Sequence, residues 1–120
     1  MASLAVVLTV LVALLHVWFV ILEMFLWMTP LGYRIFGTDP HFAERSGPLA
    51  ANQGLYNGFL VAGLVWSLVA GDPIRYPLRV FFLTCVLVAG LFGSVTVSRR
   101  ILLVQALPGA LALAAVLAAG

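Results

Sequence analysis

Four long apolar stretches follow one another along the chain, separated by short groups of polar, glycine and proline residues. They cover residues 4–27, 49–70, 78–97 and 101–119. A helix needs about 20 mostly apolar residues to cross a hydrocarbon core about 30 Å thick, so each stretch is long enough. The pattern predicts an all-α fold, a polytopic membrane protein whose single domain over residues 1–120 is a bundle of four transmembrane helices.

Turn-forming or charged residues mark the boundaries between these stretches. They are Trp27, Pro30 and Gly32 after the first, Ser46-Gly47-Pro48 before the second, Gly71-Asp72-Pro73 after it, and Arg99-Arg100 before the fourth. Pro48 would stand near the first turn of the second helix, where proline is tolerated. In the long first loop, Asp39-Pro40 indicates a helix N-terminus, so a short surface helix over residues 40–45 is expected.

The composition favours lipid as the solvent of this chain. Of its residues 64% are hydrophobic and 8% are charged, whereas soluble domains are roughly half apolar and about a quarter charged. The net charge is only +2, and the positive residues do not form a stripe. A nucleic-acid-binding protein would carry such a stripe, so nucleic acid is excluded as a partner. Cys85 is the single cysteine, so neither a disulfide framework nor a thiolate metal site is expected.

The arginines predict an orientation in the cell (inner) membrane. Four of them lie on the side of the first and third loops, and two, Arg75 and Arg79, lie on the opposite side. By the positive-inside rule, both termini then face away from the cytoplasm. The first stretch is not expected to be a cleaved signal peptide, because no positive charge precedes it and His16 and Glu23 interrupt it.

Small residues recur at intervals of four in three of the predicted helices. The rows are Gly54, Gly58 and Ala62; Gly90, Ser94 and Ser98; and Ala106, Ala110, Ala114 and Ala118. Such rows let helices approach closely in lipid, either within one chain or between subunits. We therefore expect Gly58→Leu to disrupt packing, Pro108 to bend the fourth helix, and the chain to form a dimer or trimer.

The first stretch carries two ionisable residues that lipid disfavours. His16 and Glu23 are seven residues apart, so they share one helix face with Thr9, about 10 Å apart along the axis. The start of the second stretch supplies polar partners: Asn52, Gln53, Tyr56 and Asn57. Glu23 should lie level with Asn52 and Gln53, and His16 deeper. The pattern predicts a polar pocket that opens toward the first loop, with a histidine at its floor.

Three functions remain open for this pocket. The first is an intramembrane enzyme or binding protein for a small lipophilic ligand. In it, Glu23 would be a general acid or base, and Tyr56 would orient the substrate. His16 would be a second acid or base, or a coordinating ligand. Asn52, Gln53, Asn57 and Trp27 would bind the ligand, and no metal is expected. In a proton-coupled transporter or efflux component, Glu23 and His16 would form a relay. In a structural membrane subunit, a neutral Glu23 would only lock two helices together.

Two segments carry a resemblance to a known family. Residues 16–27, HVWFVILEMFLW, and residues 50–60, AANQGLYNGFL, resemble the domain-of-unknown-function 1304 family of small bacterial four-span membrane proteins. The similarity extends over nearly the whole chain. It implies a membrane protein without an assigned activity.

A weaker similarity is architectural. Four short helices with polar groups at the start of the second resemble the membrane-associated eicosanoid and glutathione metabolism superfamily, which implies trimers with sites between subunits. Its Arg–Asn–Glu pattern is not reproduced, because no acid follows Asn52. Residues 46–52 are also similar to membrane styrene oxide isomerases, whose haem is held by a histidine just before this run. Arg45 occupies that position here, so a haem would have to use His16 or His41.

Overall fold

The computed structural model describes residues 1–120 and contains helices only. They are α1 (Ala2–Met24), α2 (Pro30–Phe36), α3 (Pro40–Val69), α4 (Arg75–Thr96), the π-helix η1 (Leu102–Ala106) and α5 (Leu107–Ala119). The expected all-α fold is confirmed. Three helices are long and apolar enough to cross a membrane, namely Ala2–Met24, Arg75–Thr96 and Leu102–Ala119.

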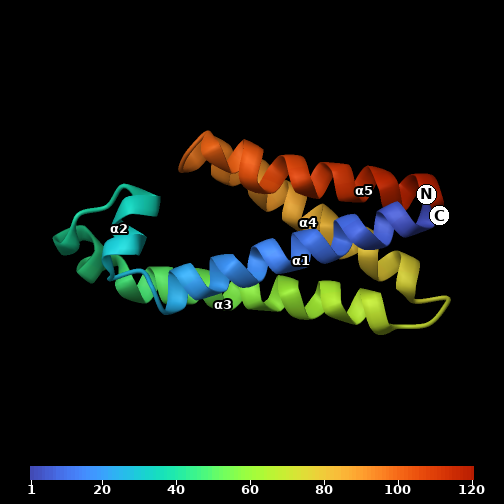
Figure 1. Ribbon diagram of the computed structural model, residues 1–120, viewed down its shortest axis with the longest axis horizontal. Coiled ribbons are helices and arrows are strands. Elements are labelled where there is room, and N and C mark those ends of the chain that lie inside the picture. Colours follow the sequence, from blue (N-terminus) through green and yellow to red (C-terminus); the bar gives the residue numbers. More distant parts are fainter.

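The long helices lie side by side as antiparallel neighbours (Figure 1). α1 packs on α3 and α5, α3 also packs on α4, and α4 packs on η1 and α5. Both termini lie at one end of the molecule, called here the termini end. α2 and the tip of the α4–η1 hairpin lie at the other end, called here the loop end.

The buried core is small and the surface is apolar. Only 23 of the 120 residues are buried, and large hydrophobic side chains are exposed along every long helix. Soluble monomers rarely show such continuous apolar surface. The exposed faces therefore agree with the length and hydropathy of the three helices that can cross a membrane.

The first loop is more helical than the pattern predicted. Asp39 caps α3 by accepting a hydrogen bond from the Phe42 N–H at 2.9 Å, as expected. The helix does not stop at residue 45, however, but continues to Val69, so Pro48 lies inside it. The expected boundary at Ser46-Gly47-Pro48 is wrong, because the residues on both sides keep helical geometry although Pro48 cannot donate a backbone hydrogen bond.

Residues 30–36 form a helix that the pattern did not predict. The Thr29 hydroxyl accepts a hydrogen bond from the Gly32 N–H at 3.2 Å, and Pro30 occupies the first turn. Gly37 ends α2 in the left-handed conformation with φ of 66°, which glycine adopts without steric cost. Trp27, Pro30 and Gly32 therefore close α1 and also build this short helix.

The three rows of small residues differ in how closely they pack on neighbouring helices. A Cβ on Gly90 would lie 2.8 Å from the backbone nitrogen of Ala106, so this glycine allows α4 to approach η1 closely. Gly54 lies against Met24 and Glu23, but no atom lies within 4 Å of a Cβ on Gly58. Within one chain, the expected contact at Gly58 is wrong. Ala106 is buried, whereas Ala114 and Ala118 of its predicted row are exposed.

Pro108 was expected to bend the fourth long helix, and it lies directly after a change of helix type. The ring of a proline inside a helix clashes with the carbonyl four residues earlier and supplies no N–H. The backbone widens just before it into the π-helix Leu102–Ala106, after which α5 continues. In this segment Gln105 donates a hydrogen bond to the Val86 carbonyl of α4 at 3.0 Å, which links the two arms of the hairpin.

Candidate functional site

The polar side chains of α1 lie on one stripe, as expected. Thr9, His16 and Glu23 are seven residues apart, and Thr9 and His16 are fully buried. The Thr9 hydroxyl donates to the Ala5 carbonyl at 2.7 Å, within its own helix. This stripe therefore faces the other helices.

His16 holds an unused nitrogen in the interior. Its Nδ1 lies 2.9 Å from the Val12 carbonyl, which can only accept, so Nδ1 carries the proton. In the neutral ring Nε2 is then an acceptor, and this atom is buried without a hydrogen-bond partner. The ring also makes an edge contact with Phe19, with ring centroids 4.9 Å apart. Buried polar atoms without partners are rare and call for a physical explanation, such as a catalytic role or a bound water molecule.

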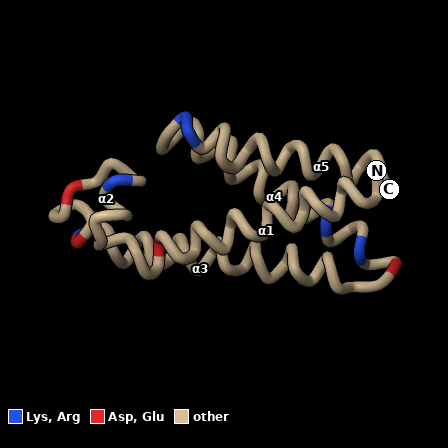
Figure 2. Tube along the Cα trace, in the orientation of Figure 1, with Lys and Arg blue, Asp and Glu red and all other residues tan.

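Glu23 joins α1 to α3 through Asn57. The Asn57 amide nitrogen donates to one carboxyl oxygen of Glu23 at 2.5 Å. Asn57 is buried and Glu23 is half-buried, and Gly54, one turn earlier on α3, leaves room for the Glu23 side chain. Figure 2 shows that most charged residues gather at the two ends of the molecule, whereas Glu23 belongs to the apolar helix α1.

The other predicted partners of Glu23 lie elsewhere. Asn52, Gln53 and Tyr56 are exposed, and the carboxyl group bonds to Asn57 instead. The expected bond to one of those three residues is wrong, because the face of α3 that packs on α1 carries Ala50, Gly54 and Asn57. Their spacing of four and three is the stripe typical of a packed helix, and it could have identified Asn57 as the partner.

Trp27 is tied to the start of α3. Its indole N–H lies 3.1 Å from both the Ala43 carbonyl and the Ser46 hydroxyl. Its ring centroid lies 4.7 Å from that of Phe36 in α2. Trp27 therefore fixes the loop-end segments to one another. The sequence pattern identified the residue but neither of these contacts.

α3 and α4 touch in the middle of the molecule and separate toward the loop end. A Cβ on Gly63 would overlap the Phe82 ring, so these residues mark a close contact between the two helices. Two turns nearer the loop end, on the same helix faces, stand Tyr56 of α3 and Ala89 of α4. Both are exposed, and 58% of the Tyr56 surface is accessible. The facing surfaces of α3 and α4 are therefore not in contact at the level of Tyr56 and Ala89.

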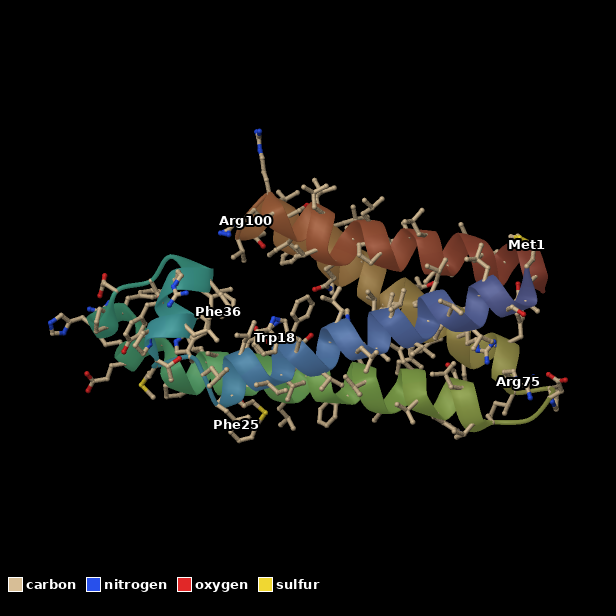
Figure 3. The ribbon with its side chains drawn as sticks, in the orientation of Figure 1. Met1, Trp18, Phe25, Phe36, Arg75 and Arg100 are labelled. Atoms are coloured by element: carbon tan, nitrogen blue, oxygen red, sulfur yellow. The ribbon has the colours of Figure 1, made fainter.

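The α1–α3 pair and the α4–η1–α5 hairpin thus diverge, as Figure 1 shows. We call the region where the two pairs lie apart, marked by the exposed residues Tyr56 and Ala89, the loop-end crevice. Trp18 is 41% exposed and lies on the side of α1 that faces the hairpin tip (Figure 3). Asn52, one turn beyond Tyr56 on α3, is exposed on the same face.

His16 stands at the depth where this crevice closes. α1 and α3 are antiparallel and are joined by Glu23 and Asn57. Seven residues deeper on each helix, about 10 Å along the axis, are His16 and Leu64, both fully buried. Leu64 follows Gly63, which packs on Phe82. The structure therefore brings Glu23 and Asn57 together, leaves Tyr56 exposed on the neighbouring part of α3, and buries His16 about two turns deeper on α1.

The tip of the α4–η1 hairpin carries arginines and a cavity. Arg100, at the hairpin tip, donates to the Ile35 carbonyl of α2 at 3.4 Å, and Figure 3 shows it directed toward α2. The hairpin tip holds a cavity of about 620 Å³, lined by Ser94, Val95, Val97, Ser98, Arg99 and Leu102. Figure 2 shows no acidic residue at this tip.

The residues do not fit a metal ion or a haem. No three His, Cys, Asp or Glu side chains lie close enough together to hold a metal ion. His16 is fully buried, and its Nε2, the atom that would ligate a haem iron, is enclosed with it. His41 is exposed near the start of α3, outside the crevice. The site is one of carboxyl, imidazole, amide and phenol groups.

Comparison with known proteins agrees with the resemblance of the two segments described above. A family model described as "Protein of unknown function (DUF1304)" matches residues 10–117. The chain belongs to the DUF1304 family. It is also 33% identical over 107 residues to the uncharacterized protein YpaA of Lactococcus lactis subsp. lactis (strain IL1403), covering 88% of this chain and 89% of that relative. No solved structure matches the chain.

Proposed function

We propose that this DUF1304 protein is a four-span membrane protein that binds, and chemically transforms, a small lipophilic molecule in the loop-end crevice. α3 is the fourth span in this proposal. It packs alongside α1 and α4 (Figure 1), and its exposed apolar side chains include Leu55, Phe59 and Trp66. Its lower hydropathy comes from the amides of its first half, which the crevice and α1 provide with a polar environment.

The observation that carries the proposal is the hydrogen bond between Glu23 and Asn57 beside the crevice. A carboxyl group at this depth is costly in lipid, and such groups usually serve a function. Asn57 engages one of its oxygens, so the other is left to address a ligand. Glu23 would give or take a proton there, and Tyr56 and Asn52 would orient the polar group of the ligand.

His16 would act at the floor of the crevice. Its Nε2 has no partner within the chain and, as an acceptor, could receive a hydrogen bond from a ligand or a water molecule. The two acid–base groups lie about two turns apart on α1, which is suited to a molecule that extends along the crevice. Gln53 and Trp27 would contribute at the mouth only.

The unpartnered His16 nitrogen also supports a second candidate function, a proton-coupled transporter. Glu23 and His16 would then pass a proton along α1 through water. A chain of four short helices would need to assemble into a dimer or trimer to form a complete pathway, because it offers no inverted repeat. Proton flux measured in liposomes with a trapped pH dye distinguishes the two: flux that Glu23→Gln abolishes favours transport.

The test of the binding function is the set of small molecules that remain with the purified protein. Wild-type protein and the variants Glu23→Gln, Tyr56→Phe and Glu44→Gln are purified in the same detergent, and their organic extracts are compared by mass spectrometry. We expect one lipophilic compound to be enriched with wild type and with Glu44→Gln, the control outside the crevice, and depleted with the other two. Identical extracts from all four proteins would contradict a binding function.

A lipophilic carbodiimide provides a test that needs no known ligand. Dicyclohexylcarbodiimide adds to a protonated carboxyl group and rearranges to a stable N-acylurea, which mass spectrometry locates. The chain has four carboxylic side chains, of which Glu23 alone lies within the apolar part of a helix. We expect the label on Glu23 in membranes, and none there with a water-soluble carbodiimide. Labelling confined to Asp39, Glu44 and Asp72 would contradict a lipid-accessible acid.

A further inference from the structure

A cavity of about 190 Å³ lies at the termini end, where α1 and α4 begin and α5 ends. We call it the termini-end cavity. Its polar lining consists of Asp72, Arg75, Tyr76 and Arg79, and its apolar lining includes the buried residues Ala5 and Val116. Ligand pockets for whole small molecules are usually larger, whereas this volume corresponds to roughly six water molecules at about 30 Å³ each. The cavity therefore suits one small polar group, and it lies at the opposite end of the molecule from the loop-end crevice.

Two arginines present their positive charges to this cavity. Arg75 and Arg79 are four residues apart in α4, so they lie one turn from each other on the same face of the helix. Figure 3 shows Arg75 at the end of the molecule that also carries Met1. Like charges at this spacing repel each other, so an anion held between them would lower the free energy of this arrangement.

The chain does not neutralise the two charges. The Nε of Arg79 is buried without a hydrogen-bond partner. The Nε of Arg75 donates to the Ala70 carbonyl at 2.9 Å, which carries no net charge. Asp72 lines the same cavity but makes no ion pair with either arginine. Partly buried cations at the end of an apolar helix are costly without a counter-charge, so the lining calls for an anion from outside the chain.

The donors around the cavity match a phosphate group. A guanidinium binds phosphate oxygens through paired N–H donors in charge-assisted hydrogen bonds. Two guanidinium groups one turn apart can reach different oxygens of one tetrahedral phosphate, whereas a carboxylate has two oxygens in one plane. The Tyr76 hydroxyl is a further donor in the lining. A Cβ on Gly120 would overlap the Tyr76 ring, so this ring also closes the cavity against the end of α5.

We propose that the termini-end cavity is a binding site for a phosphate group, which Arg75 and Arg79 hold between them with the Tyr76 hydroxyl as a third donor. The phosphate belongs either to the headgroup of a phospholipid in the surrounding leaflet or to a free phosphate ion, since both present the same chemistry to the arginines. Asp72 sets one negative charge against two positive ones, so it limits the affinity. The site is separate from Glu23 and does not depend on the proposed function.

The test is protection of Arg75 from phenylglyoxal, which forms covalent adducts with accessible guanidinium groups that mass spectrometry locates. Purified protein in detergent is labelled alone and with inorganic phosphate, acetate, phosphatidylglycerol or a diacylglycerol with the same acyl chains. At about ten times Kd, the phosphate-bearing ligand should slow labelling of Arg75 by about tenfold. Arg45, exposed at the loop end, is the control within the same sample and should be labelled at an unchanged rate. Protection by phosphatidylglycerol but not by inorganic phosphate supports the lipid headgroup as the source, and protection by both supports the free ion.

Three variants separate this cavity from the other arginines. Arg79→Gln keeps Arg75 as the reporter and should weaken the protecting ligand by at least about tenfold. Asp72→Asn removes the opposing charge and should strengthen it severalfold. Arg99→Gln/Arg100→Gln, the control at the hairpin tip, should leave Kd unchanged. Circular dichroism checks that each variant is folded, and if Arg79→Gln does not fold, the increase in affinity with Asp72→Asn still decides.

Several results would overturn the inference. Labelling of Arg75 that no phosphate-bearing ligand slows would mean that the cavity binds no phosphate group. Equal protection of Arg75 and Arg45 would mean general screening of surface arginines. Equal protection by acetate and phosphate would indicate a site for carboxylates, and equal protection by the diacylglycerol and phosphatidylglycerol would mean that apolar contact alone shields the residue. An unchanged Kd in folded Arg79→Gln would exclude this cavity as the site. None of these results bears on the proposed function of the crevice.

Discussion

Asn57 of α3 donates its side-chain amide to Glu23 of α1 at 2.5 Å, and this bond joins the two helices beside the crevice. Asn57 is buried, so it has little access to another partner when the acid is removed. Interhelical hydrogen bonds in membrane proteins contribute about 1 kcal/mol, and rarely more than about 2. The bond therefore contributes modestly to stability, and it also fixes the position of the Glu23 carboxyl group.

The first prediction concerns this pair. Glu23→Leu should lower the free energy of unfolding in detergent by about 1–2 kcal/mol, because it leaves the Asn57 amide unpaired. Glu23→Gln should cost less, since its carbonyl can still accept from Asn57. A double-mutant cycle with Asn57→Leu measures the coupling, and zero coupling energy would contradict a direct bond between the two side chains.

The second prediction compares two glycines. Gly90→Leu should destabilise the protein by at least about 1–3 kcal/mol, because its side chain would enter the Ala106 backbone of η1. Gly58→Leu should change the thermal stability of the monomer little, since no atom lies within 4 Å of a Cβ there. Thermal unfolding in detergent measures both. A similar loss of stability in both variants would show that Gly58 is also covered.

The mass of the Gly58→Leu particle in detergent tests whether Gly58 lies at a contact between subunits. If the exposed Gly58 row joins subunits, Gly58→Leu should reduce the particle to a single chain without unfolding it. Phe59→Leu is the matched control, because it changes a neighbouring exposed side chain but keeps its bulk apolar. Small-residue rows pack helices in either setting, so the particle mass is the measurement that separates them.

The helical fold followed from local patterns, whereas the pairing of helices did not. The long apolar stretches predicted α1, α4 and the continuous segment of η1 and α5 closely, and Asp39-Pro40 predicted the start of α3. The helix boundary expected at Pro48 is wrong, because proline ends many helices but is tolerated inside others. Whether α3 continues through Pro48 depends on its contacts with neighbouring segments, among them the bond from Trp27 to Ser46, which no local pattern contains.

The site was predicted only in part, because local patterns do not show how the helices pack against one another. The shared stripe of His16 and Glu23 depends on helix periodicity alone and is confirmed. The choice among the four polar residues of α3 depends on how α3 is rotated against α1, and here Gly54 and Asn57 face Glu23. The crevice depends on the divergence of two helix pairs beyond Gly63 and Phe82, a property of tertiary packing.

The third prediction concerns the loop end. Trp27→Phe keeps the ring contact with Phe36 but removes the indole N–H that reaches Ala43 and Ser46. It should lower stability by about 1 kcal/mol, and the segment around α2 should become more sensitive to limited proteolysis. Trp66→Phe, at an exposed position of α3, is the control. Equal proteolysis of both variants would mean that the bonds of Trp27 do not hold this segment.

The fourth prediction concerns orientation. Both termini lie at the same end of the molecule (Figure 1), and the loop end carries Arg34, Arg45, Arg99 and Arg100. By the positive-inside rule, a reporter that is active only in the cytoplasm should be inactive when fused after Gly120. The same reporter inserted after Gly37 should be active. The reverse result would invert the orientation but leave an even number of spans.

The last prediction fills the crevice without touching its polar groups. Ala89 is exposed on the face of α4 that opposes Tyr56, so Ala89→Trp should be accommodated in the fold and should occupy the space between the helix pairs. Thermal stability should stay within about 0.5 kcal/mol of wild type, as for most substitutions at exposed positions. The lipophilic compound that is enriched with the wild-type protein should no longer be retained.

Val88→Trp is the matched control for this variant, since Val88 is exposed next to Ala89 but lies on a different face of α4. It adds the same bulk and should retain the compound. Loss of the compound in both variants would point to a general effect of tryptophan on α4, and retention in both would exclude the space beside Ala89 as the binding site. Loss in Ala89→Trp alone is the result expected if the ligand lies between α3 and α4.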